Sequence, residues 1–382
     1  MSQINTLHRI GLALTLSILL TACGDHHVAV GTSSEVPTAT SFSSIECFNS
    51  TDNLMRHAQN VAVFKSDSCY EIVVRNPWDS TALLGTYLID EPFVRMVCYS
   101  ATQWSVLEHL DELHRVKGVL EGRYVTDSVM RQLLDTGKVM DVGIESHTDM
   151  ERLMTLQPDI VLYTPYQGGG DGINAALLPN TLLFPFADYL ETTPLGRAEW
   201  IRVLGVMTGR QDDADVWFEE VEQRYLNLKS RTAECQSHPT VFTDLPFNGQ
   251  WYVAGGQSYI ARLFADAGAD YIWADNSSSA SVPMDFETIL AKAQHADFWR
   301  VANSIGRPMT YESLLQDIPS CALFDAFKQH RLILCDVKTT GYFERSSMQP
   351  DILLADFIWF FHSELLTDEW EGYEPKFYQL LK

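Results

Sequence analysis

The architecture depends on residues 193–231, which read TPLGRAEWIRVLGVMTGRQDDADVWFEEVEQRYLNLKSR. Thr193 is a typical helix N-cap, and Pro194 fits the first helical turn because its ring already fixes a helical φ. Apolar residues continue along one face until Gly209, a residue typical of helix ends. At about 1.5 Å per residue, residues 195–208 would span about 21 Å. The sequence therefore predicts a helix long enough to bridge the backs of two lobes.

A second helix is expected directly after Gln211. The acidic residues in its first turns, which favour a helix N-terminus, are Asp212, Asp213 and Asp215. The apolar residues expected along its one buried side are Val216, Phe218, Val221, Tyr225 and Leu228. Both helices form a linking segment over residues 193–231. Because a helical strut bends little, we expect only small lobe movements when a ligand binds.

Strands alternate with helices on both sides of the linking segment. In residues 91–192, expected strands such as 93–99 and 160–164 are separated by expected helices such as 102–114. Residues 232–382 repeat this texture. Such alternation predicts right-handed crossovers and largely parallel sheets. The expected fold class is α/β, with two doubly wound α/β lobes joined by one long linking helix and a ligand cleft between the lobes.

A small β unit is predicted ahead of the first lobe, within residues 47–90. Three short runs of β-branched and aromatic residues, separated by turn residues, are typical of antiparallel strands. These runs are residues 61–64, 70–75 and 83–89.

The first 22 residues have the features of an export signal. The apolar run IGLALTLSILL, residues 10–20, is too short to span a membrane as a helix, which takes about 20 residues. It leads into Leu20-Thr21-Ala22-Cys23, which resembles a bacterial lipobox. We therefore expect a lipoprotein signal peptide over residues 1–22, with Cys23 acylated by chains such as palmitate. Residues 23–46, rich in Ser, Thr, Gly and Pro, are predicted to be a flexible tether.

Composition limits the classes of partner. Lys and Arg number 27 against 50 Asp and Glu, which gives a formal charge of −23 among 382 residues. This balance argues against a nucleic-acid-binding protein, which needs cations to neutralise phosphates. No CxxC pair suggests a zinc or redox site, and the sequence cannot choose a disulfide pairing among the cysteines after Cys23.

Several segments resemble the iron-siderophore/cobalamin family of ABC-transporter substrate-binding proteins, whose two lobes share a helical backbone. Residues 187–200, ADYLETTPLGRAEW, resemble the start of the family's linking helix. Residues 251–259, WYVAGGQSY, and 266–275, DAGADYIWAD, are similar to its second-lobe cleft segment. Further similar segments, found in the family's order over about residues 60–380, are LQPDIVL at 156–162, DVG at 141–143, PMDFE at 283–287, ADFW at 296–299, QPD at 349–351 and FHSELL at 361–366.

The resemblance implies a monomeric receptor without catalytic residues or a resident cofactor. It would capture an iron(III)-siderophore-type chelate and deliver it to an ABC permease in the inner membrane. The protein would be exported and lipid-anchored, facing the periplasm. Cobalamin or haem could be bound by the same architecture.

Candidate ligand contacts lie in loops after the carboxyl ends of the predicted strands, where doubly wound lobes bind ligands. A large, partly apolar chelate needs aromatic faces and a few fixed polar groups. The aromatic residues of these loops are Tyr99, Trp104, Tyr124, Tyr166, Trp251, Tyr252, Tyr342 and Phe343, and all but Phe343 are the predicted aromatic contacts. Arg123, Lys338 and Arg345 are the cations of these loops and would attract an anionic chelate. We expect Arg123 and Arg345 in particular to contact the ligand.

Family members commonly place an acidic residue on each lobe to meet the permease. In the first lobe, Asp171 lies in the matching loop. In the second lobe, residues 257–259 occupy the comparable place without an acid. Asp171 is therefore the predicted permease contact.

Three other functions remain open from sequence alone. A receptor for a bare metal ion would need about four converging His and carboxylate ligands, but only His147 falls near a predicted cleft loop. An exported enzyme acting on a chelate would need a catalytic motif, and neither GxSxG nor HExxH occurs. A surface protein that binds another protein in its cleft is the third alternative.

Overall fold

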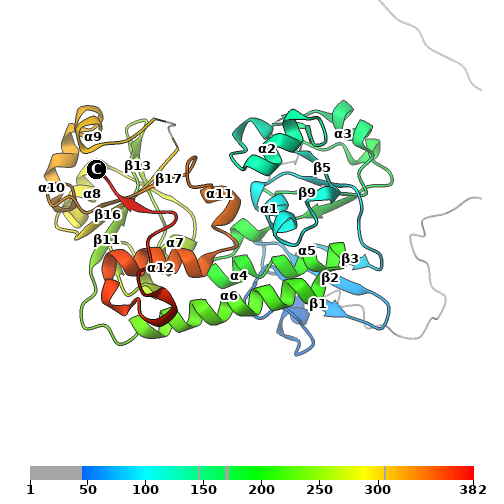
Figure 1. The fold of residues 1–382 in the computed structure, drawn as a ribbon, viewed down its shortest axis with the longest axis horizontal. Coiled ribbons are helices and arrows are strands. Elements are labelled where there is room, and N and C mark those ends of the chain that lie inside the picture. The colour runs from blue at the N-terminus through cyan, green and yellow to red at the C-terminus, as the bar shows by residue number, and fades with distance from the viewer. Residues whose placement is uncertain (1–44, 145–146, 168–171, 305–306) are drawn as a thin grey trace, which may run out of the picture. The chain divides into compact units, whose positions relative to one another are not determined.

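The computed structural model describes residues 45–144, 147–167, 172–304 and 307–382, which belong to one compact unit, residues 42–382. The predicted signal peptide, Cys23, nearly all of the tether and Asp171 lie outside the described residues. Within those ranges, no helix combines the length and apolar character needed to cross a membrane. Figure 1 shows two α/β lobes above a layer of long helices.

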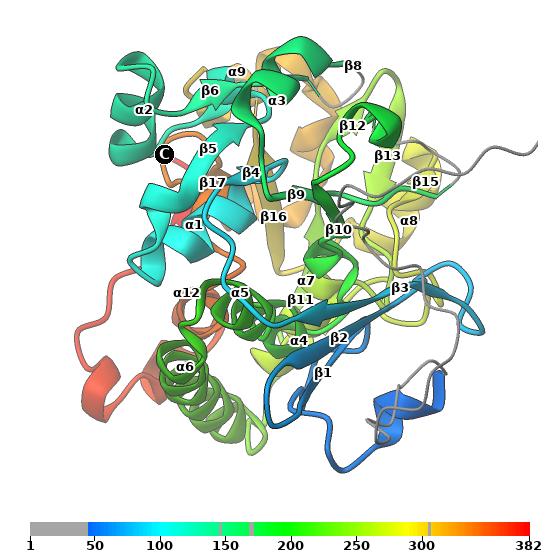
Figure 2. The ribbon, with the colours of Figure 1, turned by 90° about the vertical axis from the view of Figure 1, so that its right-hand side faces the viewer.

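The N-terminal β unit forms an antiparallel sheet in the order β1-β2-β3, as predicted. Both faces are covered, because Val61 and Val63 point into the first-lobe core while Ala62 and Phe64 pack on Cys47. Figure 2 shows this sheet beside the helices α4 (Pro194–Ala198), α5 (Ile201–Thr208) and α6 (Gln211–Thr232). The elements of this unit are η1 (Ile45–Asn49), β1 (Val61–Lys65), β2 (Tyr70–Arg75) and β3 (Leu83–Ile89), where η denotes a 3-10 helix.

The first lobe is built on a parallel sheet in the order β10-β9-β4-β5-β6. Alternate residues of β4 are buried on opposite faces of this sheet. Met96 and Cys98 pack in the core that includes the linking helices, while Val97 packs in a separate core on the other face, with Leu153 of α3. Its strands are β4 (Met96–Cys98), β5 (Val116–Val119), β6 (Met140–Asp141), β9 (Ile160–Tyr163), β10 (Leu182–Pro185) and the hairpin β7 (Gly143–Ile144) and β8 (His147–Thr148). Its helices are α1 (Ala101–His109), α2 (Ser128–Asp135), α3 (Met150–Leu156), η2 (Leu113–Arg115), η3 (Gly122–Tyr124), η4 (Ala175–Leu177) and η5 (Asp188–Leu190).

The second lobe has a sheet in the order β14-β11-β16-β17-β18, parallel except for the terminal strand β18. A smaller antiparallel sheet has the order β12-β13-β15. The strands are β11 (Thr240–Thr243), β12 (Pro246–Phe247), β13 (Gln250–Val253), β14 (Asp270–Tyr271), β15 (Val282–Met284), β16 (Phe298–Asn303), β17 (Leu332–Asp336) and β18 (Gln379–Leu380). The helices are α7 (Tyr259–Asp266), α8 (Phe286–Ala293), α9 (Tyr311–Asp317), α10 (Asp325–Lys328), α11 (Tyr342–Arg345), α12 (Pro350–Phe361), η6 (Pro319–Leu323), η7 (Ser363–Leu365) and η8 (Asp368–Trp370).

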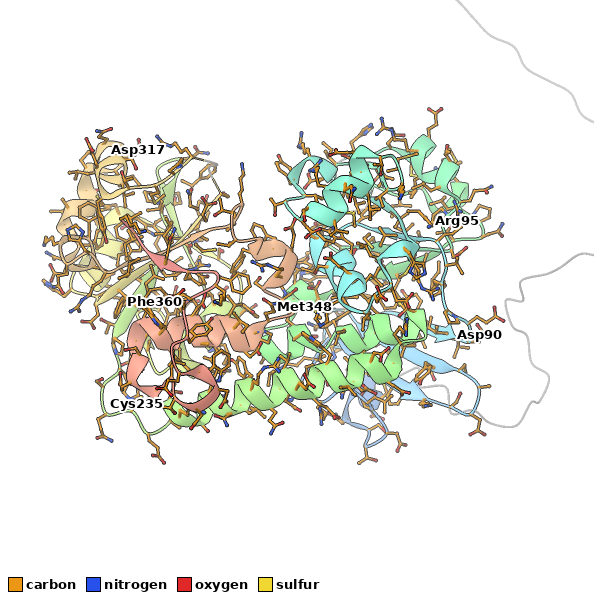
Figure 3. The ribbon with its side chains drawn as sticks, viewed as in Figure 1. Asp90, Arg95, Cys235, Asp317, Met348 and Phe360 are labelled. Atoms are coloured by element: carbon orange, nitrogen blue, oxygen red, sulfur yellow. The ribbon has the colours of Figure 1, made fainter. Side chains whose placement is uncertain are left out.

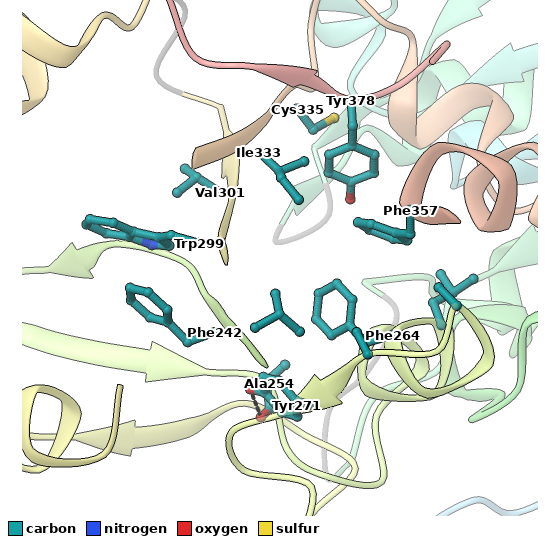
Figure 4. Packing of buried hydrophobic residues seen from close by; sticks show 14 of the residues in the cluster. Phe242, Ala254, Phe264, Tyr271, Trp299, Val301, Ile333, Cys335, Phe357 and Tyr378 are labelled. Atoms are coloured by element: carbon teal, nitrogen blue, oxygen red, sulfur yellow. Dashed lines mark hydrogen bonds between the residues drawn. The ribbon is translucent and has the colours of Figure 1, made fainter. Parts of the chain in front are cut away.

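Aromatic rings fill the second-lobe core (Figure 4). The ring of Phe242 stacks on that of Trp299, with centroids 4.9 Å apart, and on that of Phe324 at 5.1 Å. The buried hydroxyl of Tyr271 donates to the carbonyl oxygen of Ala254 at 2.6 Å, so this ring carries no unpaired polar atom into the core.

The lobes are joined by α4 (Pro194–Ala198), α5 (Ile201–Thr208) and α6 (Gln211–Thr232). The predicted helix over 195–208 is divided at a tightened turn, where the N–H of Trp200 donates to the carbonyl of Arg197. From Ala198 onward its buried apolar side chains belong to the first-lobe core. The helix that runs from one lobe to the other is therefore the next one, α6. Gly209, with φ +75°, ends α5 as expected.

Helix α6 spans both lobes. Its 22 residues span about 33 Å. Ala214 and Phe218 are buried in the first-lobe core, while Tyr225 and Leu228 are buried in the second-lobe core. The prediction that Val216 shares this face was wrong, because a residue two positions from Phe218 points to the other side of a helix, and Val216 is 59% exposed.

Met348 adds a second bridge at the base of the lobes. It follows α11 in the second half of the chain, yet it is buried in the first-lobe core. Figure 3 shows it between the lobes, above the linking helices.

Candidate ligand-binding cleft

A cleft of about 560 Å³ lies between the lobes. The first lobe lines it with segments after β4 and β5, and the second lobe with segments after β16 and β17. These are the carboxyl ends of parallel strands, where open α/β sheets place their ligands. The lining residues are Tyr99, Ser100, Ala101, Thr102, Trp104, Leu120, Glu121, Tyr124, Val125, Thr126, Arg197, Ser304, Val337, Lys338, Gly341, Phe343 and Glu344.

The start of α1 forms a fixed part of the first-lobe wall. Ser100 is the N-cap, and the side-chain Oε1 of Gln103 accepts from the backbone N–H groups of Tyr99 at 2.8 Å and Ser100 at 3.1 Å. The hydroxyl of Tyr99 lies 3.0 Å from that of Thr148, which holds the phenol ring in place. The Tyr99 ring is therefore positioned before any ligand arrives.

Two aromatic rings stand exposed at the cleft, one from each lobe. Tyr124 is 58% exposed and Phe343 is 60% exposed. The guanidinium of Arg123 lies 4.6 Å from the centre of the Tyr124 ring, a cation–π contact. Exposed aromatic faces on both sides of a cleft suit a flat, partly apolar ligand.

An ion pair between η5 and α4 lies at the cleft. The Nε of Arg197 lies 3.3 Å from Oδ2 of Asp188. Burial raises the pKa of Asp188, while Arg197 and the Thr102 hydroxyl oppose this rise. The hydroxyls of Ser100 and Thr102 are 3.1 Å apart and line the same cleft.

Glu344 connects the two lobes across the cleft. Its buried carboxylate, on the second-lobe helix α11, accepts from the backbone N–H of Thr126 at 2.6 Å and of Asp127 at 3.1 Å, and from the Thr126 hydroxyl. Hydrogen bonds to a charged acceptor are stronger than neutral ones. This contact joins the two lobes at one side of the cleft.

Replacing Glu344 with alanine should expose the amides that it accepts from. We expect hydrogen exchange at Thr126 and Asp127 to become faster by about tenfold or more, because a hydrogen bond to a charged group contributes about 1.5 kcal/mol or more. Exchange mass spectrometry would measure this, with the exposed Glu151→Ala as the matched control. Unchanged exchange at both amides would show that the contact does not hold the lobes.

The structure brings together only some of the predicted site residues. Tyr99, Trp104 and Tyr124 line the cleft with Lys338. Trp104 is 2% exposed, so it supports the wall from behind more than it offers a face to a ligand.

The remaining predicted aromatic residues lie apart from the lining. Trp251 is 1% exposed, and its Nε1–H donates to the carbonyl of Thr243 at 2.9 Å, which makes it a core residue. Tyr252 is 45% exposed on β13. Tyr342 packs against the second-lobe core, and the Tyr166 ring lies 6.4 Å from that of Tyr189.

The two predicted arginines also lie outside the lining. Nη2 of Arg345 donates to the carbonyl oxygen of Thr340, and its guanidinium lies 5.4 Å from the Phe377 ring. Arg123 is engaged with Tyr124. The cation that sequence reasoning missed is Arg197, because it lies on the linking segment, which has the pattern of a purely structural helix. Its one signal was an arginine among apolar neighbours in PLGRA.

No cluster of three or more His, Cys, Asp or Glu side chains able to hold a metal ion occurs in the part of the chain that the structure describes. The six cysteines that lie there, Cys47, Cys69, Cys98, Cys235, Cys321 and Cys335, are free thiols. Burial raises the pKa of the Cys98 thiol, which disfavours the reactive thiolate.

Comparison with known proteins agrees with this geometry. A family model described as "Periplasmic binding protein" matches residues 97–339. Among curated proteins, an uncharacterized lipoprotein of Methanocaldococcus jannaschii is 27% identical over 288 residues, covering 72% of this chain and 67% of the relative. A second uncharacterized lipoprotein of that organism is also 27% identical, and the chain spans about two thirds of each relative's length.

Solved structures share the fold. A periplasmic heme-binding protein from Pseudomonas aeruginosa has a TM-score of 0.55 and 18% identity, covering 71% of this chain and 93% of that one. An ABC-type Fe3+-hydroxamate transport protein from Saccharomonospora viridis has a TM-score of 0.56 and 16% identity, covering 75% and 97%.

Proposed function

Because this chain belongs to the periplasmic binding protein family, we propose that it captures an iron(III)-siderophore-type chelate and delivers it to an ABC importer. The observation that carries this proposal is the cleft between the lobes. Both lobes line it at the carboxyl ends of their parallel strands, and each contributes an exposed aromatic ring. Its volume of about 560 Å³ falls within the range of small-molecule sites.

The proposed ligand contacts are those that line the cleft. Tyr124 and Phe343 would cover the faces of the chelate, and Lys338 would meet a peripheral negative charge. Cobalamin or haem is the alternative cargo. The fold neighbours, one a heme-binding protein and one an Fe3+-hydroxamate transport protein, support a bulky metal complex as the class of ligand.

The same proposal gives the protein its place in the cell. Acylation of Cys23, with chains such as palmitate, would anchor it after removal of the signal peptide, and lipoprotein relatives support this. The monomeric receptor would face the periplasm and meet its permease in the inner membrane, with Asp171 as a first-lobe contact.

Native mass spectrometry of the full-length protein, released from detergent, tests the ligand. The protein is offered a mixture of ferric siderophores, cobalamin and haem, and we expect one chelate per chain. Retention of cobalamin alone would overturn the siderophore assignment, and retention of none would overturn the receptor function. Recovery of a chemically altered chelate would instead favour the exported enzyme.

A further inference from the structure

We propose that Arg197 binds a pair of anionic oxygens on the cargo, so that the end of the ligand that enters the cleft is negatively charged. This inference rests on the proposed receptor function. It names the chemistry of the ligand, which is a chelate carrying carboxylate or catecholate oxygens.

The first argument is the set of unused donors on Arg197. The residue lines the cleft, and its side chain is only 20% exposed. Its Nε faces Asp188, whereas Nη1 and Nη2 make no hydrogen bond to any residue that the structure describes. A guanidinium held through Nε presents its two terminal nitrogens as a fork, which matches two adjacent anionic oxygens.

The second argument is the polar surroundings of this fork. The guanidinium lies 5.5 Å from the centre of the Tyr259 ring. The hydroxyl of Tyr259 is buried and has no hydrogen-bond partner among the described residues. Ser100 and Thr102, which line the cleft together with Arg197, add two hydroxyls 3.1 Å apart. A buried polar atom without a partner is costly, so the Tyr259 hydroxyl beside Arg197 fits a site that a ligand or its water completes.

The other charges of the cleft are consistent with an anion at this point. Glu344 is engaged by Thr126 and Asp127. Glu121 and Lys338 both line the cleft and offset each other. Asp188 balances the charge of Arg197 but contacts only its Nε. The two terminal nitrogens can therefore donate charge-assisted hydrogen bonds to an anion even though the cleft as a whole is not strongly positive.

The test compares chelates that differ in charge. Dissociation constants are measured for a ferric tris-catecholate and for haem, which are anionic, and for a ferric tris-hydroxamate, whose iron centre is neutral. The variant is Arg197→Gln with Asp188→Asn, which removes both partners and leaves no buried lone charge. The matched control is Arg152→Gln with Asp149→Asn, an exposed pair outside the cleft with Nε and Oδ2 3.1 Å apart.

We expect affinity for the anionic chelate that the parent binds to fall by about 10- to 100-fold in the cleft variant, as for a lost hydrogen bond to a charged group. The control variant should bind the anionic chelate with the same dissociation constant as the parent. If the hydroxamate binds, its dissociation constant should change by less than about threefold, the size of effect expected from a substitution that removes no contact. If the double variant fails to fold, Arg197→Lys takes its place. This variant keeps the positive charge but loses the two parallel N–H donors, so it should also weaken anion binding.

Four outcomes would overturn the assignment. Unchanged anion affinity in the cleft variant would exclude Arg197 as the binding group. An equal loss for anionic and neutral chelates would show a structural role. Binding of the neutral chelate alone by the parent would leave the receptor function standing and remove only this inference, whereas binding of no chelate would remove both.

Discussion

Replacing Glu199 with alanine should lower the free energy of unfolding by about 3–5 kcal/mol, because its carboxylate accepts several hydrogen bonds and each bond to a charged group contributes about 1.5 kcal/mol or more. Glu199 is fully buried. Its carboxylate accepts from the backbone N–H groups of Arg56, His57 and Ala58 at 2.7–2.8 Å, and from Nη1 of Arg202 at 3.0 Å. The alanine variant would leave the three backbone N–H groups without this acceptor, whereas Nη1 of Arg202 keeps the carbonyl oxygen of Leu54 at 2.8 Å.

Urea unfolding followed by circular dichroism measures this loss. Glu220→Ala is the matched control, since Glu220 lies on α6 with a 64% exposed side chain and should change stability by less than about 1 kcal/mol. If Glu199→Ala unfolds at the same urea concentration as the control, the segment 56–58 is not held by this carboxylate.

The contribution of the neighbouring Glu191 to the stability of the protein should fall as pH rises from 4.5 to 7. Burial raises the pKa of Glu191 from the ordinary 4.5 to about 7, and Glu199 adds to the rise, against the N–H groups of Gln59, Asn60 and Trp200. The folded state therefore holds a proton that the unfolded state has released. The stabilisation is complete below pH 4.5 and is lost as pH rises through 7, by about 3 kcal/mol.

The measurement is the difference in unfolding free energy between pH 5 and pH 7.5, for the parent and for Glu191→Gln. Glutamine cannot titrate, so the variant should show a flatter dependence even if it is less stable at every pH. Equal slopes for the two proteins would contradict the raised pKa, because other titrating groups are common to both.

Both predictions concern the contact of residues 56–60, just before β1, with the carboxylates of Glu191 and Glu199, which the sequence did not reveal. Glu199 has the pattern of an ordinary acidic residue in the first half of a helix. Its burial arises because residues 56–58, more than 140 positions earlier, turn their N–H groups toward it. Local pattern carries no information about such a distant partner.

The fold was largely predictable where periodicity is local. The antiparallel strands around residues 61–89 and the apolar stripe of α6 from Phe218 to Leu228 follow from spacing alone. The cleft was only partly predictable. Trp251 precedes glycines in a loop-like context, a pattern shared by core and binding residues, and the structure places it in the core. Arg197 and Glu344 gain their roles only when elements from both halves of the chain meet.

The shared burial of α6 has a consequence for how proteins of this design can recombine. One end of the helix completes the core of the first lobe and the other end completes the core of the second. A chimera with its junction inside the helix would join two apolar stripes shaped for different neighbours. Ligand specificity should therefore be exchanged between relatives only when the whole of α6 comes from one parent protein, or when single loops that line the cleft are transplanted.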